Sequence, residues 1–196
     1  MCGRYGLTVS KEELEERYEA KWSEGDFTGQ EEIFPTADTV VLLPNRKLYR
    51  IKWGFTPNFA KRPLINARSE TILEKKTFKE PFSKRRCLIP ATYFFEWQKV
   101  ESIEKKEKKR IQMKDLPIFS MAGICERYTN ENGESQLTYS ILTTEANKQM
   151  ASIHDRMPVI LEPEDEQFYL NLDNDPKEVQ ALLKPSSRKL EITHVG

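Results

Sequence analysis

Residues 85–99 read RRCLIPATYFFEWQK, and they form the densest strand signal in the chain. β-Branched and aromatic side chains dominate this stretch, and such residues pack well on the pleated surface of a sheet. We predict two strands that break at Pro90, because proline is poorly tolerated inside a sheet. The stretch therefore predicts a fold built mainly from β-structure.

Weaker strand signals extend from this stretch toward both ends of the chain. They are short apolar or alternating runs bounded by turn-forming residues. Turns are expected at Pro44-Asn45 and at Asn132-Gly133. The expected strands cover residues 2–9, 39–43, 48–55, 110–114, 118–126, 136–144, 157–161 and 189–194.

Three segments between these signals are expected to contain no strand. Residues 22–37 show no periodicity and are expected to be irregular, and residues 57–66 form a proline-bounded loop. Residues 99–110 are a charged, low-complexity excursion, which predicts a solvated hairpin tip.

Helices are expected to be few and peripheral. Ser10 and Glu13 have the spacing of a capping box, which predicts a charged helix that continues to about Ala20. Antiparallel strands with a few such helices predict one compact α+β domain over residues 1–196, mostly antiparallel β-sheet and barrel-like. Further short helices are expected near residues 69–74, 77–82, 163–171 and 176–183.

The composition fits a polar-surfaced globular protein, with 196 residues, 38% hydrophobic and 32% charged. No run approaches the roughly 18 apolar residues of a membrane span, and the start of the chain lacks the apolar region of a signal peptide. The cysteines are three in number and form no C-x-x-C pair, which argues against a disulfide scaffold or a zinc site. We therefore expect a cytoplasmic protein with no membrane partner and no metal site. Nothing in the sequence demands more than a monomer, and no cofactor is expected.

Charge is unevenly distributed along the chain, although the formal net charge is zero. Residues 46–86 hold 13 Lys and Arg against 3 Glu, whereas residues 11–32 and 162–178 are both acidic. Such segregation can produce a basic face that binds phosphates. The alternative is a set of solvated lysines on scattered loops.

Cys2 directly follows the initiator methionine. If Met1 is removed, the α-amine and the thiol of Cys2 lie on adjacent carbons. Their ordinary pKa values, about 7.7–8.0 and about 8.5, leave both groups partly nucleophilic near neutral pH. This 1,2-aminothiol is able to attack carbonyl groups, whereas the alternative is a frayed terminus with an incidental thiol.

Glu96 lies in the FFEWQ run of the strongest strand signal. In a strand, Phe94, Glu96 and Gln98 share one face. A carboxyl group surrounded by aromatic residues is partly desolvated, which raises its pKa and suits it to general acid–base catalysis near neutral pH. The alternative is a glutamate on a wet face, paired across the sheet with a lysine.

His154 lies in the run IHDRMPVIL, beside Asp155 and just before an expected strand. A histidine next to a carboxylate at a loop end is a candidate proton carrier. A structural histidine in a turn is the alternative.

Asn66 and Arg68 lie two residues apart in the run LINARSE. In an extended segment both side chains project to the same side, so an amide that orients polar groups lies next to a guanidinium that binds phosphate. Trp53 and Phe59 are aromatics within the basic stretch, where bases of a single strand could stack. For Trp53 and its neighbour Phe55 the alternative is a place in the core.

Five blocks of sequence occur together in one order. They are M-C-G-R, W-G-x-x-P, L-I-N-A-R-x-E, R-R-C-L-I-P-A with F-F-E-W, and I-H-D-R-M-P. This set of blocks, between Cys2 and about Leu161, resembles the SOS response-associated peptidase (SRAP) family of abasic-site sensors.

The resemblance implies a protein that binds single-stranded DNA and links its N-terminal cysteine to the ring-opened aldehyde of an abasic site through a thiazolidine. It implies that Cys2 is the nucleophile, Asn66 orients the cysteine and the sugar, Glu96 transfers protons and His154 assists at the sugar oxygen. The name peptidase reflects a proposed self-removal of Met1. The DNA-binding residues implied are Arg4, Trp53, Phe59, Arg68 and Arg86.

This sequence departs from the family pattern at three points. Thr92-Tyr93 stands where the family usually has Asp-Gly, and Asn58-Phe59 stands where it often has tryptophans. The sequence ends at Gly196, whereas the family usually continues with a further short segment, and we expect this difference to affect stability more than chemistry.

Two other functions fit parts of the pattern. A thiol peptidase that acts on other proteins through Cys2 would use the nucleophile and would need no basic stretch. A non-catalytic single-strand binder would use the cations and aromatics, and Cys2→Ala would leave its activity intact.

Overall fold

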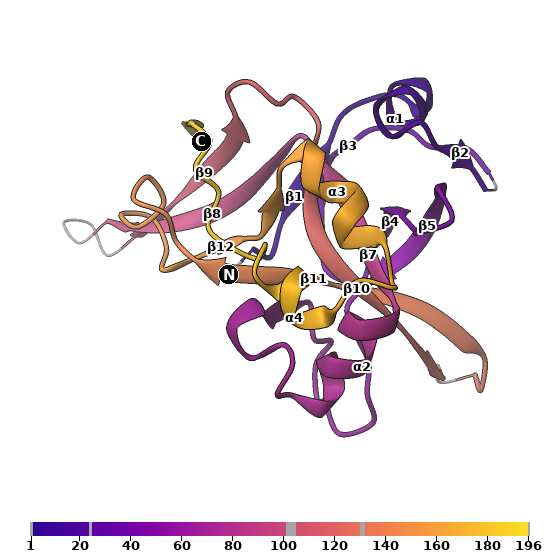
Figure 1. Cartoon of the computed structure of the whole chain (residues 1–196). Helices are drawn as coiled ribbons and strands as arrows, with labels where there is room; N and C mark the ends of the chain where they lie inside the picture. The colour runs from indigo at the N-terminus through magenta and orange to yellow at the C-terminus, as the bar shows by residue number, and fades with distance from the viewer. Residues whose placement is uncertain (1, 24, 101–104, 130–131, 196) are drawn as a thin grey trace.

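A closed barrel organises the fold in the computed structural model, which describes residues 2–23, 25–100, 105–129 and 132–195 (Figure 1). Neighbouring barrel strands pair antiparallel, and the parallel pair β5–β11 closes the ring at Tyr139 and Trp53. In the described chain the barrel strands are, in ring order, β11 (Ser135–Glu145), β10 (Phe119–Thr129), β7 (Arg86–Ala91), β4 (Asp38–Leu42) and β5 (Lys47–Trp53).

A second sheet continues from the barrel, because β7 leads directly into β8. All pairings in this second sheet are antiparallel. Its strands are, in spatial order, β14 (Leu190–Val195), β9 (Lys105–Met113), β8 (Tyr93–Val100), β1 (Tyr5–Leu7) and β3 (Gln30–Ile33).

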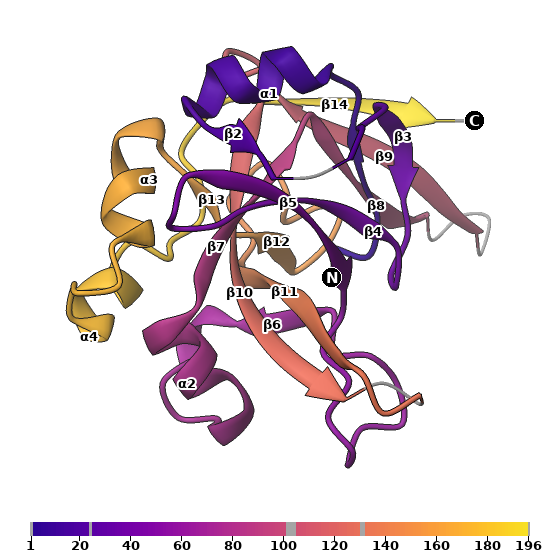
Figure 2. The ribbon, with the colours of Figure 1, turned by 90° about the vertical axis from the view of Figure 1, so that its right-hand side faces the viewer.

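Short strands and helices complete the fold, with the helices arranged around the outside of the barrel (Figure 2). In the described part of the chain, no helix combines the length and the apolar character needed to cross a membrane. The short strands are β2 (Lys21–Trp22), β6 (Asn66–Arg68), β12 (Arg156–Pro158) and β13 (Ile160–Leu161), and the helices are α1 (Lys11–Tyr18), the 3₁₀ turn η1 (Ser69–Thr71), α2 (Lys76–Lys84), α3 (Pro163–Leu170) and α4 (Pro176–Gln180).

The predicted fold class is confirmed: this is an α+β domain of mostly antiparallel strands with peripheral helices. The capping box is also confirmed, since the Ser10 side chain accepts from the Glu13 amide and the Glu13 carboxylate accepts from the Ser10 amide. A cap of this kind satisfies two backbone donors at the start of α1.

The predicted strand break lies at Thr92 and not at Pro90. Pro90 is inside β7, opposite Ser120 of β10. In the described pairings, β4 pairs with β7 only at Leu88. At Pro90 the neighbouring strand is therefore β10 alone, and the missing proline N–H costs no hydrogen bond to a strand on the opposite edge of β7. Thr92 makes the turn by bonding through its amide and hydroxyl to the Gly6 carbonyl.

Three other strand predictions need correction. Residues 22–37 are not wholly irregular, because β5 supplies a partner for β2 and β1 supplies one for β3. The charged segment 99–110 is largely strand, since Lys99 pairs with Lys106 in the β8–β9 ladder, and residues 101–104 lie outside the described part. The expected strand at 157–161 divides at Val159, where the chain passes from β11 to β10 as partner.

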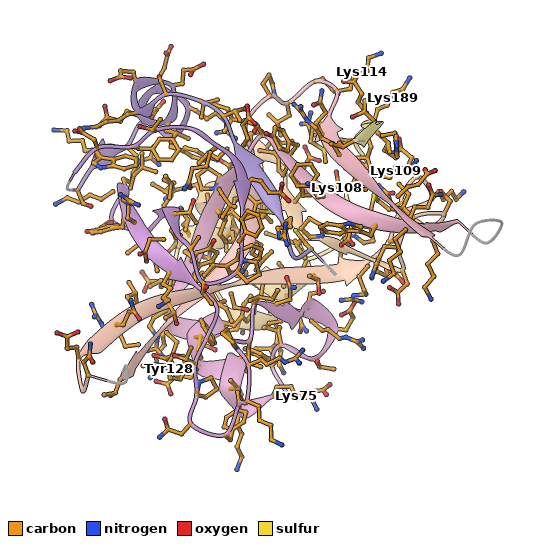
Figure 3. The ribbon with its side chains drawn as sticks, turned by 180° about the vertical axis from the view of Figure 1, so that it is seen from behind. Lys75, Lys108, Lys109, Lys114, Tyr128 and Lys189 are labelled. Atoms are coloured by element: carbon orange, nitrogen blue, oxygen red, sulfur yellow. The ribbon has the colours of Figure 1, made fainter. Side chains whose placement is uncertain are left out.

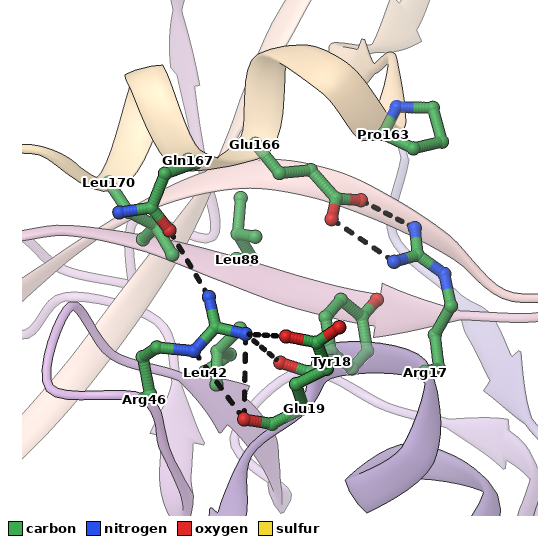
Figure 4. A pocket seen from close by; sticks show the side chains of 10 residues that line it. All are labelled: Arg17, Tyr18, Glu19, Leu42, Arg46, Leu88, Pro163, Glu166, Gln167 and Leu170. Carbon is green, nitrogen blue, oxygen red and sulfur yellow. Dashed lines mark hydrogen bonds and ion pairs between the residues drawn. The ribbon is translucent and has the colours of Figure 1, made fainter.

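A partly buried ion pair joins α1 to α3 (Figure 4). Arg17 donates to both oxygens of Glu166, over distances of 2.6 and 3.1 Å, and Ser120 donates to the same carboxylate. A cavity of about 190 Å³ lies beside this pair, and Arg46 closes its other side by bonding to Gln167 and the Tyr18 carbonyl. Every polar group named here has a protein partner, so we assign the cavity a structural role.

Candidate active site

The start of the chain lies along β8, and this places Cys2 near Glu96. Tyr5 pairs with Phe94 and Gly6 with Tyr93, and the Phe95 amide donates to the Arg4 carbonyl over 2.9 Å. Because the strands are antiparallel, the residues before β1 run alongside Glu96. In both Figure 1 and Figure 2 this start of the chain lies near β11 and β12.

The Cys2 side chain is buried, and its thiol lies 3.8 Å from the Arg4 carbonyl oxygen. Burial raises the pKa of the thiol well above its usual range, and the negative charge of nearby Glu96 raises it further. A thiol in this setting needs a base before it becomes a thiolate.

Asn66 holds the backbone of Cys2. Its Nδ2 atom donates to the Cys2 carbonyl over 3.0 Å, and β6 is fixed beside β11 by the parallel pairing of Asn66 with Ile141. The Oδ1 atom of Asn66 is buried, and none of the described groups donates a hydrogen bond to it. An unsatisfied buried acceptor at this position is suited to a ligand hydroxyl or amine.

Glu96 is almost fully buried, with 2% of its surface exposed. Desolvation raises the pKa of its carboxyl group above the ordinary value, and nearby His154 opposes this shift. The sequence-based expectation of a desolvated glutamate therefore agrees with the structure. Such a carboxyl group can exchange protons closer to neutral pH than an exposed glutamate can.

His154 lies in the loop between β11 and β12, and two neighbours face its Nδ1 atom. The Arg156 amide lies 3.0 Å away and Asp155 Oδ1 lies 2.8 Å away. Unprotonated Nδ1 accepts from the amide, whereas protonated Nδ1 donates to the carboxylate, so Nδ1 has a partner in either state. Gln98, two residues after Glu96, ties this loop to β8 by donating to the Ser152 carbonyl.

Arg156 and Glu70 form a brace that the sequence analysis did not predict. Arg156 makes two bonds to the Glu70 carboxylate, of 2.7 and 2.8 Å, and a third to the Thr143 carbonyl. These contacts join the segment that carries Asn66 to the segment that carries His154. The only feature of the sequence that pointed to Arg156 and Glu70 is that both lie inside the five sequence blocks described above.

Trp53 is fully buried, and this corrects its assignment to DNA contact. Its ring stacks on Tyr139 and meets Tyr5 edge-on, and the two tyrosine hydroxyls lie 2.8 Å apart. The indole N–H donates to the Ile65 carbonyl, next to Asn66. Trp53 is therefore a core residue beneath the site, which was the alternative weighed for it, and Phe55 is buried as well.

Arg86 is also fully buried, so it offers no surface to DNA and its assignment is corrected. Its guanidinium donates to the carbonyls of Phe82, Tyr169 and Asn171, at 2.8, 2.6 and 2.6 Å. These carbonyls belong to the last turns of α2 and α3, where backbone acceptors lack helical partners. Arg86 therefore caps two helices from inside.

The other predicted DNA-binding residues reach the surface. Arg4 is half-buried, pairs with Glu32 over 2.7 Å and lies with its guanidinium 3.8 Å from the centre of the Phe34 ring. Arg68 is exposed on β6, and the extended β6 sets it on the same face as Asn66, as predicted. Phe59 is 72% exposed.

Phe59 belongs to a loop that Phe55 and Leu64 close by pairing their backbones. Its neighbours Asn58 and Ala60 line an open cavity of about 700 Å³, which extends to the hairpin between β10 and β11. The side chains that line this cavity include amide and ammonium groups, and the exposed Phe59 ring lies in the same loop. These are groups that contact bases and phosphates in nucleic-acid complexes.

The four candidate catalytic residues come from separate segments of the chain and meet where the barrel joins the second sheet. The arrangement provides a thiol, an amide that fixes its backbone, a carboxyl group with a raised pKa and an imidazole. Nucleophilic addition to a carbonyl with proton transfer is the chemistry that such a set supports. In the described residues no group of three or more His, Cys, Asp or Glu side chains is placed to hold a metal ion.

The fold and the site define an α+β barrel protein with a cysteine-centred candidate active site. A family model described as SOS response associated peptidase (SRAP) matches residues 1–196. The chain belongs to this family.

Curated relatives share one name. The chain is 35% identical over 196 residues to the abasic site processing protein YoqW of Bacillus subtilis, which covers 94% of this chain and 87% of that protein. It is 28% identical over 154 residues to the rat abasic site processing protein HMCES, covering 62% of this chain and 44% of that protein.

Solved structures share the fold. A protein from Bacteroides thetaiotaomicron superimposes with a TM-score of 0.88 at 29% identity, over 100% of this chain and 92% of that one. A protein from Bordetella bronchiseptica gives a TM-score of 0.85 at 24% identity, over 100% of both chains, and this second likeness concerns the fold alone.

Proposed function

We propose that this protein binds single-stranded DNA and links Cys2 covalently to the aldehyde of an abasic site. The observation that carries the proposal is the convergence of Asn66, Glu96 and His154 on the Cys2 end of the chain. The relatives named as abasic site processing proteins support the choice of substrate.

The linkage forms in two steps once Met1 has been removed. The α-amine of Cys2 adds to the aldehyde carbon, and loss of the aldehyde oxygen as water leaves an imine. The thiol then adds to the imine carbon, its proton passes to the nitrogen, and a five-membered thiazolidine results. Because amine and thiol belong to one residue, ring closure is intramolecular, for which effective concentrations reach roughly 10⁵ M or more.

The surrounding side chains perform the proton transfers. Glu96 takes a proton from the α-ammonium, and in its protonated form it delivers one to the departing oxygen. His154 donates to the sugar oxygen as the ring opens. Asn66 holds the Cys2 carbonyl, and its free acceptor receives a bond from the amine or from the sugar. The same side chains are candidates for removal of Met1.

Arg4, Arg68 and Phe59 bind the strand that carries the lesion. The two cations contact phosphates, and Phe59 stacks on a base. This set replaces the one expected from the sequence, because Trp53 and Arg86 are buried.

The test is a crosslinking assay on a denaturing gel. Purified protein, shown by intact mass to begin at Cys2, is mixed with a single-stranded oligonucleotide that contains one abasic site. We expect a denaturant-stable shifted band with the abasic strand and none with an intact strand. Cys2→Ala should abolish the band, and Cys125→Ala, which changes another buried thiol, should retain it.

Borohydride separates the two chemical steps. Cys2→Ala keeps its α-amine, so it should still form an imine that borohydride traps as a stable band. Failure of the processed wild-type protein to form any band would exclude the proposal. A peptide-hydrolysis assay would then test the alternative of a Cys2-dependent thiol peptidase.

A further inference from the structure

The strand register places a lysine directly opposite Glu96. In the antiparallel β8–β9 pair, Glu96 faces Lys109, and the pair before it, Phe94 and Ile111, is buried in the core. Residues directly opposite in such a pair share a face, with Cβ atoms about 4.5–5.5 Å apart. A lysine in this position would ordinarily form an ion pair with the glutamate and hold it ionised.

The Lys109 ammonium is instead engaged along its own strand. Its Nζ atom donates to Glu107 Oε2 over 2.6 Å, and the two side chains are 16% and 33% exposed. This bond holds the pKa of Glu107 below its ordinary value. His194 of β14 also lies near this carboxylate, with its Nδ1 atom 3.6 Å from the same Oε2 atom.

The neighbouring Lys108 lies on the opposite face of the sheet and has a different partner. Lys108, which Figure 3 labels with Lys109 on β9, points to the opposite side of the sheet. It donates to both oxygens of Glu32, at 2.8 Å each. Lys109, and not Lys108, is therefore the β9 lysine that shares a face of the sheet with Glu96 and lies directly opposite it.

We infer that Glu107 is a positioning residue that holds the Lys109 ammonium away from Glu96, so that Glu96 remains available for proton transfer. The consequence for crosslinking rests on the proposed function. Among the described residues, the titratable groups near Glu96 include the thiol of Cys2 before β1, the imidazole of His154 and the ammonium of Lys109, and the α-amine of Cys2 joins them once Met1 is removed. Lys109 carries the positive charge that lies directly opposite Glu96 in the strand register, so the distance between its ammonium group and the carboxyl group matters for proton transfer.

The direct test is a carboxyl-carbon NMR titration of Glu96 in protein labelled at glutamate, with the signal assigned by its loss in Glu96→Gln. Glu107→Gln frees Lys109 to approach Glu96. We expect the Glu96 midpoint to fall by more than one pH unit and by up to about three, the shift for a unit charge about 4 Å away at an effective dielectric near 20. Adding Lys109→Met to that variant should return the midpoint toward the wild-type value.

Glu191→Gln is the matched control, because it removes the same charge from β14 opposite Gln112, on the other face of the sheet. It should leave the midpoint unchanged. An unchanged midpoint in Glu107→Gln, or an equal shift in Glu191→Gln, would overturn the inference. The titration needs no DNA, so it stands or fails separately from crosslinking. If crosslinking occurs, its pH–rate limb should move with the midpoint.

Discussion

Glu96 combines two properties that conflict at neutral pH. Its burial suits it to proton transfer, and the same burial opposes the charged form. The folded state therefore binds the Glu96 proton more tightly than the unfolded chain does. As pH rises from the ordinary glutamate value of about 4.3 through the raised folded pKa, this residue loses its contribution to stability.

Replacing Glu96 by Gln tests both properties together. Proton transfer by a positioned group contributes about 10²–10⁴-fold, so crosslinking at pH 7 should slow by that range. The variant should melt at a higher temperature than wild type at pH 7 to 8, and the difference should shrink toward pH 4. Thermal melts across this pH range, with rates from the gel assay, check both; a variant less stable than wild type at pH 8 would contradict the argument.

Arg68 is an exposed cation on the same face as Asn66, and we assign it to a phosphate. Arg68→Ala should weaken binding to single-stranded DNA and reduce the slope of log affinity against log salt by about 0.7–1. Fluorescence anisotropy at several salt concentrations measures this. Lys21→Ala on β2 removes an exposed cation outside the site and serves as the control, with an expected slope equal to wild type.

At the scale of elements, Arg86 connects β7 to the ends of α2 and α3. Its three carbonyl acceptors would lose their donor in Arg86→Met, a change that keeps most of the side-chain volume. Leaving buried polar groups unsatisfied costs about 1–3 kcal/mol each, so we expect a loss of about 3 kcal/mol or more in unfolding free energy. Chemical denaturation measures it.

The same variant discriminates the structural role from the DNA contact expected from the sequence. At a temperature where Arg86→Met is still folded, its salt slope for DNA binding should equal that of wild type. A stable variant with a reduced slope would restore Arg86 to the DNA surface.

At the scale of the whole molecule, the Arg17–Glu166 pair joins the N-terminal helix to the segment after the last barrel strand (Figure 4). Removing one partner leaves a buried charge, so Arg17→Met should lower the unfolding free energy by about 3 kcal/mol. The double variant Arg17→Met with Glu166→Gln should recover much of this loss, because neither charge then remains. Urea unfolding of the three proteins checks both statements, and a single-variant cost under about 0.5 kcal/mol would contradict them.

Features that depend only on residues close together in the chain were predicted correctly from the sequence. Alternation along FFEWQ separated Glu96 from Trp97, and the spacing of Ser10 and Glu13 predicted the cap that the structure contains. The two adjacent nucleophiles of a processed Cys2 follow from its covalent structure alone. The order of the five blocks was sufficient to recognise the family that the family model also finds.

Tertiary structure decided what depends on partners from distant segments. The same residue types, aromatic and cationic, are buried at Trp53 and Arg86 and exposed at Phe59 and Arg68. Nothing in their immediate sequence distinguishes them, because burial depends on Tyr139 stacking from β11 and on helix ends that happen to meet beside β7. Sequence by itself determined the chemistry available to the protein, and the closed barrel decided which groups meet at Cys2 and which remain inside.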